Sequence, residues 1–141
     1  MKKKELKLWH VAISVSDLDR SIHFYQEIFG FRVVKRFYIE ALKAEACFIE
    51  KNGMVIELFS FKDFDPLPEY RKDLLTDLKT LGVKHFAFRT ENIDEIHDYL
   101  KNIKNMEFAT NIRKGGSGLR YFFIKDPDGI LIEIIEKRGE I

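Results

Sequence analysis

The chain has 141 residues, the size of one ordinary domain or of two very small fused modules. It is 45% hydrophobic, and its 24 Lys and Arg nearly balance its 23 Asp and Glu, so it lacks the strong positive field that attracts nucleic acid. No apolar stretch is long enough to span a membrane, and the single cysteine, Cys47, excludes an internal disulfide framework. Composition therefore predicts a globular protein of the reducing cytoplasm, with no nucleic-acid or membrane partner and with Cys47 in its core.

The first part of the sequence predicts one helix and four strands. Leu6 to Val15 has the alternation of a strand, Asp17 is a helix N-cap, and Gly30 ends that helix. Asn52-Gly53 is a strong hairpin signal, because both residues accept positive φ. The remaining strands are expected at residues 31–39, 44–49 and 55–61.

Residues 62–82 predict a linker with a short helix, since prolines and charges precede the leucines of one helical stretch. From residue 83 the first pattern returns, with a helix at 91–101 and a turn at 126–129. The strands of this second part are expected at residues 84–90, 108–112, 119–125 and 130–136.

The order is thus βαβββ, linker, βαβββ, which is an internal repeat. The first module covers residues 6–61 and the second covers residues 83–137 of a single domain, 1–141. We expect an α+β fold in which the two modules form a curved, incomplete eight-stranded mixed sheet or barrel around a pocket.

Four polar residues stand inside the apolar strand patterns: His10, Glu57, His85 and Glu133. The two histidines are 75 positions apart (85 − 10) and the two glutamates 76 (133 − 57), so each pair follows the repeat. A buried carboxylate is costly unless it is paired. A lone His or Glu in a strand is usually a satisfied structural residue, but four at matched positions indicate a metal site.

Strand alternation places each histidine on the face with smaller or polar side chains. These companions are Ala12, Ser14, Ala87 and Arg89. Two His and two Glu give mixed nitrogen and oxygen ligation at a formal charge of −2. This set indicates a site for Ni²⁺, Zn²⁺, Co²⁺, Mn²⁺ or Fe²⁺ and not a structural zinc site built from thiolates, and it leaves positions open for water or substrate.

The sequence resembles the vicinal oxygen chelate superfamily, which includes glyoxalase I, bleomycin-resistance proteins, methylmalonyl-CoA epimerase and extradiol dioxygenases. The resemblance covers nearly the whole chain. It is carried by residues 10–25, 53–58, 85–88 and 125–133. It implies the glyoxalase-like fold, a small-molecule substrate, a homodimer and one divalent metal ion per site, with Ni or Zn favoured.

The resemblance also assigns roles. His10, Glu57, His85 and Glu133 fall where glyoxalase I places its metal ligands, whereas the epimerase typically has Gln at the position of Glu57. The implied reaction converts the hemithioacetal of a 2-oxoaldehyde such as methylglyoxal to a hydroxyacyl thioester through an enediolate. Glu133 is then the expected catalytic base, and Glu57 acts on the other face of the substrate.

The expected substrate contacts depart from the glutathione pattern of short bacterial glyoxalases. Ser14 replaces an arginine and Phe61 replaces an asparagine. Arg89, on the face of His85, is expected to anchor an anionic substrate tail, and Arg120 is a further candidate. The metal, the thiol and the main base are left open, as is whether one chain or a dimer completes the site.

Two other functions are compatible with this pattern. One is another enzyme of the superfamily, acting on an acyl-CoA or on a different thiol adduct. The other is a non-catalytic protein that sequesters a small molecule, as the bleomycin-binding members do. Stoichiometric metal would argue against the second, and thiol preference separates the first from a glyoxalase.

Overall fold

The computed structural model describes residues 3–141, which form two compact units, the first ending at Pro66 and the second beginning at Leu67. Each unit contains one sheet, of four strands in the first and five in the second. The α+β class and the repeated order of elements are confirmed. The two modules form two sheets and not a closed barrel, since in the described residues strands pair only within their own unit.

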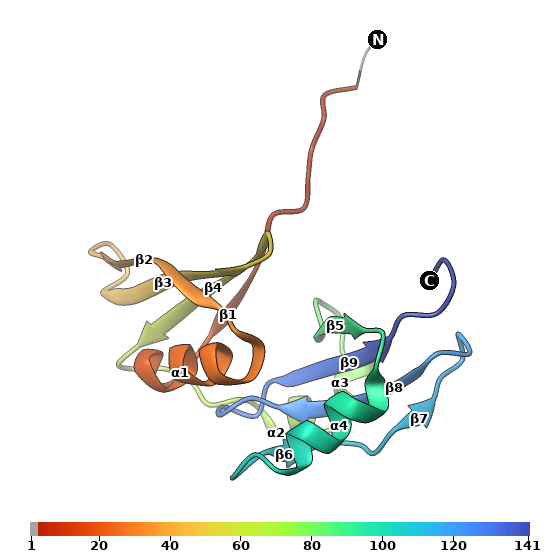
Figure 1. The fold of residues 1–141 in the computed structure, drawn as a ribbon. Coiled ribbons are helices and arrows are strands. Elements are labelled where there is room, and N and C mark those ends of the chain that lie inside the picture. Colours follow the sequence, from red (N-terminus) through yellow and green to blue (C-terminus); the bar gives the residue numbers. More distant parts are fainter. Residues whose placement is uncertain (1–2) are drawn as a thin grey trace. The chain divides into compact units, whose positions relative to one another are not determined.

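The first unit is built from five elements around a mixed sheet (Figure 1). The elements are β1 (His10–Ser14), α1 (Leu18–Phe29), β2 (Arg32–Ile39), β3 (Ala44–Lys51) and β4 (Met54–Phe61). The strand order is β1-β4-β3-β2, with β1 and β4 parallel and the other pairs antiparallel. Helix α1 covers one face and buries Leu18, Ile22 and Tyr25, so this face holds the core.

Local signals explain the ends of these elements. The Asp17 carboxylate accepts a hydrogen bond from the Arg20 backbone N–H at 3.0 Å, which caps α1 as expected. Gly30 ends the helix at φ +76°. Asn52 and Gly53 both have positive φ, as a two-residue hairpin turn between β3 and β4 requires.

The second unit repeats this plan after two short helices, where one was expected in the linker. Its elements are α2 (Glu69–Lys72), α3 (Leu74–Lys79), β5 (Phe86–Thr90), α4 (Ile93–Lys101), β6 (Glu107–Phe108), β7 (Arg113–Lys114), β8 (Arg120–Lys125) and β9 (Leu131–Glu136). The strand order is β5-β9-β8-β6, and β7 also pairs with β8. Strands β5 and β9 are parallel, as β1 and β4 are in the first unit.

Two strand predictions need correction. The first strand begins at His10 and not at Leu6, because its parallel ladder with β4 starts at the pair of His10 and Val55. The strand expected at 108–112 is split into β6 and β7. Between them the backbone N–H groups of Ala109 and Thr110 both donate to the Phe123 carbonyl, at 2.8 and 3.3 Å, which interrupts the ladder.

The turn before β9 forms as predicted. The Asp126 carboxylate accepts hydrogen bonds from the backbone N–H groups of Asp128 and Ile130, both at 2.9 Å, and Gly129 adopts φ +86°. This turn fixes where β9 starts and therefore the register that carries Glu133. Along residues 3–141, no helix has the length and apolar character needed to cross a membrane.

Candidate functional site

The first unit brings His10 and Glu57 together. The parallel register of β1 and β4 sets Ala12 beside Glu57, and His10 lies on the same face two residues earlier. The His10 Nε2 atom is 3.3 Å from Glu57 Oε1, and both side chains are mostly buried, at 27% and 15% exposure. A histidine and a carboxylate therefore meet on the sheet face opposite α1.

The second unit makes the same pair from His85 and Glu133. Ala87 lies beside Glu133 in the register of β5 and β9, as Ala12 lies beside Glu57. The His85 Nε2 atom is 3.6 Å from Glu133 Oε1, and these side chains are 21% and 17% exposed. The repeat seen in the sequence thus corresponds to a repeated constellation of side chains.

Each imidazole also packs against a phenylalanine, which sequence reasoning missed. Phe48 on β3 pairs with Glu57, and its ring centroid is 5.8 Å from that of His10. Phe123 on β8 pairs with Glu133, and its ring centroid is 4.8 Å from that of His85. The two phenylalanines are 75 positions apart (123 − 48), so the histidine spacing was the signal that could have identified them.

The nitrogen atoms of the two imidazoles differ in their surroundings. In both histidines Nδ1 is buried and has no hydrogen-bond partner in the described chain, whereas Nε2 faces the glutamate. An imidazole nitrogen beside a carboxylate oxygen is a donor set that fits a divalent cation. Along residues 3–141, no three His, Cys, Asp or Glu side chains gather as a metal cluster, and each unit holds one His–Glu pair.

Ser14 and Arg89 occupy equivalent positions in the two units. Each lies four residues after a candidate histidine, on the same strand face, and each is exposed. Within residues 3–141, the Arg89 side chain makes no ion pair or hydrogen bond, although its backbone lies in the β5–β9 ladder. Its guanidinium is available to an anion on the face of His85 and Glu133.

Arg120 lies on the other face of its sheet. Its guanidinium binds the Asp94 carboxylate on α4 through two contacts, at 3.2 and 3.1 Å, and Glu136 through Nε at 3.2 Å. The hydrogen bond to Asp94 is the main cause of the raised pKa of Arg120. The position of Arg120 therefore does not support the substrate role suggested by the sequence, since Glu133 points to the opposite face.

Comparisons with known proteins show which family the chain resembles. The sequence model of the family described as the glyoxalase/bleomycin resistance protein/dioxygenase superfamily matches residues 7–134. The chain is 30% identical to lactoylglutathione lyase GLX1 of Arabidopsis thaliana over 96% of its own length, but it spans only 46% of that plant protein. It is 33% identical to protein YaeR of Escherichia coli, with 91% and 94% of the two chains covered.

A solved structure shows the same similarity in three dimensions. The crystal structure of a glyoxalase family protein from Enterococcus faecalis superposes with a TM-score of 0.78 at 27% identity. The match covers 92% of this chain and 97% of the other. At this coverage the match extends over residues of both units.

Proposed function

This chain belongs to the glyoxalase/bleomycin resistance protein/dioxygenase superfamily, and from that premise we propose that it is a metal-dependent, glyoxalase I-like lyase. It would convert the hemithioacetal of a 2-oxoaldehyde and a thiol to a hydroxyacyl thioester. The observation that carries the proposal is the repeated pair, His10 with Glu57 and His85 with Glu133. The similarity to a plant lactoylglutathione lyase supports it.

The four residues of the two pairs are the proposed ligands of one divalent ion, with Ni²⁺ or Zn²⁺ favoured. When bound, the ion would polarise the substrate carbonyl and raise the acidity of the neighbouring C–H bond. The ligands suit this role because two neutral imidazoles and two carboxylates hold a dication without thiolates. The four ligands would come from one chain or from the two chains of a homodimer, and we infer a homodimer because members of the family commonly form dimers.

The chain's own chemistry is a proton transfer. Glu133 is the proposed base: its carboxylate takes the proton from the carbon that bears the hydroxyl and sulfur groups and returns a proton to the neighbouring carbon. The product has the same atoms as the substrate, with the hydroxyl and carbonyl positions exchanged. Glu57 occupies the corresponding position in the other unit and would act on the opposite face of the substrate.

The remaining contacts concern the part of the substrate that does not react. Arg89 is exposed, lies on the face of His85 and has no protein partner in the described chain, so it is the proposed anchor of an anionic tail. Ser14 at the matching position supplies only a hydroxyl. We therefore expect the negative charge of the thiol to be recognised mainly by Arg89 of the second unit.

The test is metal reconstitution followed by an assay with methylglyoxal and a panel of thiols. We expect stoichiometric binding of a divalent ion and thioester formation with at least one thiol, both lost in His10→Gln and His85→Gln. His23→Gln, at an exposed position of α1, is the control and should behave as wild type. Absence of metal binding, or a metal-loaded protein inactive with every thiol, would reject the proposal.

A further inference from the structure

The two candidate histidines are held in different ways. His10 is the first residue of β1 and pairs with Val55 in the sheet. His85 precedes β5, whose first paired residue is Phe86. The position of His85 therefore depends more on the segment that leads into the strand than on the sheet.

That leading segment has little else to fix it. Leu81 is 97% exposed and Val83 is 81% exposed, so their side chains contribute almost nothing to a core. Gly82 adopts φ +118°, a conformation that other residues rarely take. Within the described chain, residues 81–84 make no backbone hydrogen bond.

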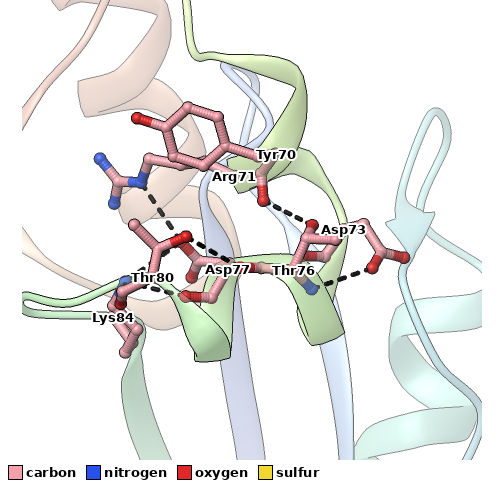
Figure 2. Close-up of polar contacts among 7 residues, drawn as sticks. All are labelled: Tyr70, Arg71, Asp73, Thr76, Asp77, Thr80 and Lys84. Carbon is pink, nitrogen blue, oxygen red and sulfur yellow. Dashed lines mark hydrogen bonds and ion pairs between the residues drawn. The ribbon is translucent and has the colours of Figure 1, made fainter.

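Lys84 is the exception, because its side chain reaches back to the end of α3 (Figure 2). Its ammonium donates to the backbone carbonyl of Asp77 at 2.8 Å and to that of Thr80. It also lies 3.6 Å from the Asp77 carboxylate. The Lys84 side chain is only 17% exposed, so these charge-assisted contacts are largely shielded from water.

Asp77 in turn is held from a second direction. Its side chain is 3% exposed and lies 3.3 Å from Arg71 Nε, which brings in α2. The Thr76 hydroxyl donates to the Tyr70 carbonyl at 2.6 Å, and the Asp73 carboxylate caps α3. Figure 2 shows these contacts converging on one helical turn, which is therefore a fixed point for Lys84.

We propose that the contacts of Lys84 with Asp77 and Thr80 form a clamp that positions the His85 imidazole. This inference rests on the proposed function, in which His85 is a metal ligand. Lys84 acts through its neighbour and touches no reacting atom, so it is a positioning residue. The equivalent position in the first unit is Trp9, whose ring lies 4.5 Å from that of His10 and which makes no such clamp.

The test compares Lys84→Met with wild type by two measurements. Divalent-ion affinity, measured by calorimetry with Zn²⁺ or Ni²⁺ alone, should fall about 10–100-fold, as it does when the partners that orient metal-binding histidines are removed. The ring-proton NMR signals of His85 should shift while those of His10 stay in place. Lys84→Arg should restore both, and Lys79→Met, at an exposed lysine of α3, should match wild type.

The outcomes separate this inference from the proposed function. If wild type binds no divalent ion, the proposed function fails and the NMR comparison alone decides the clamp. If His85 signals are unchanged in a folded Lys84→Met variant, the clamp is rejected whatever happens to affinity. An unchanged affinity beside a metal-binding wild type also rejects it. Should Lys84→Met unfold, Asp77→Asn removes the carboxylate charge with little change of shape and takes its place in both measurements.

Discussion

The two units build the same pair of side chains on different supports. In each, an alanine on the first strand lies beside the glutamate on the last, and a phenylalanine packs on the histidine. The sheets differ at their edges, where the first unit has the continuous β2 and the second has the short β6 and β7. The shared central register and the different edges show that the position of each His–Glu pair depends on the parallel strands, while the edge strands can differ without disturbing it.

The units differ again in what surrounds the pair. At the position of exposed Ser14 the second unit has exposed Arg89, and at the position of Trp9 it has Lys84. Only the second unit contains the helices α2 and α3. If the two units contributed equally to the proposed function, matched substitutions in them would change activity and stability equally. Unequal effects would therefore measure how far the two units have diverged.

The largest expected effect is a difference in kcat between variants of the two glutamates, Glu133 and Glu57. Glu133→Gln should lower kcat by about 10²–10⁴-fold, the usual contribution of a positioned general base. Glu57→Gln should lower kcat less, and both variants should be assayed with their metal content determined. Glu27→Gln on the exposed side of α1 is the control. Wild-type turnover in Glu133→Gln would end its assignment as base.

The next effect compares the two phenylalanines through stability. Phe123 is 2% exposed, so Phe123→Ala should cost about 3–5 kcal/mol of unfolding free energy, the range for a buried aromatic ring. Phe48 is only partly buried, and Phe48→Ala should cost less. Urea denaturation measures both. Equal losses would show that the two rings are packed alike despite their different exposure.

A smaller effect tests Arg89, which occupies in the second unit the position of Ser14 in the first. Arg89→Ala should raise KM about tenfold with little change in kcat, because it removes one charge-assisted contact made equally in the ground and transition states. Ser14→Ala should leave KM nearly unchanged. Arg138→Ala, near the end of the chain, controls for net charge. An unchanged KM in Arg89→Ala would remove the anchor from the proposal.

The smallest effect concerns acid stability. The backbone N–H of Arg120 donates to Glu136 at 2.8 Å, and this bond is the first cause of the lowered pKa of Glu136. The stabilisation is present above the ordinary pKa of 4.5 and is lost as pH falls through the lowered value. The first unit has Ser60 at the matching position, three residues after Glu57, and so lacks this carboxylate.

Thermal unfolding between pH 7 and pH 3 can detect the difference. Glu136→Gln should have a lower Tm than wild type at neutral pH, and the gap should narrow as the solution becomes more acidic. Glu140→Gln, an exposed residue beyond β9, should follow the wild-type curve. A gap that stays constant with pH would mean that Glu136 contributes through packing alone.

Sequence patterns predicted what is encoded locally. Asp17, Gly30 and the Asn52-Gly53 dipeptide have conformational preferences of their own, so the ends of α1 and the β3–β4 hairpin were confirmed. The alternation of small and bulky residues also predicted the face of each histidine correctly. The pairing of each His with its Glu is compatible with the proposed metal site, which remains a prediction.

Features that depend on distant partners were beyond sequence reasoning. The start of β1 is decided by where β4 begins, and the break after β6 by two amides that share the Phe123 carbonyl. The face of Arg120 depends on the register of β8 against β9, which alternation within one strand cannot supply. The burial of Asp77 was also not predicted, because it lies in the segment for which the sequence indicated only a linker with a short helix.

The parallel strand pairs also have a consequence for the order of folding. Within each unit the hairpin contacts are local, whereas Ala12 meets Glu57 across 45 positions (57 − 12) and Ala87 meets Glu133 across 46 (133 − 87). Contacts between distant residues carry the larger loop-closure entropy and form late. Each His–Glu pair therefore forms only when the first and last strands of its unit pair, which is a late step in folding. During synthesis, the first pair can assemble only after β4 has left the ribosome.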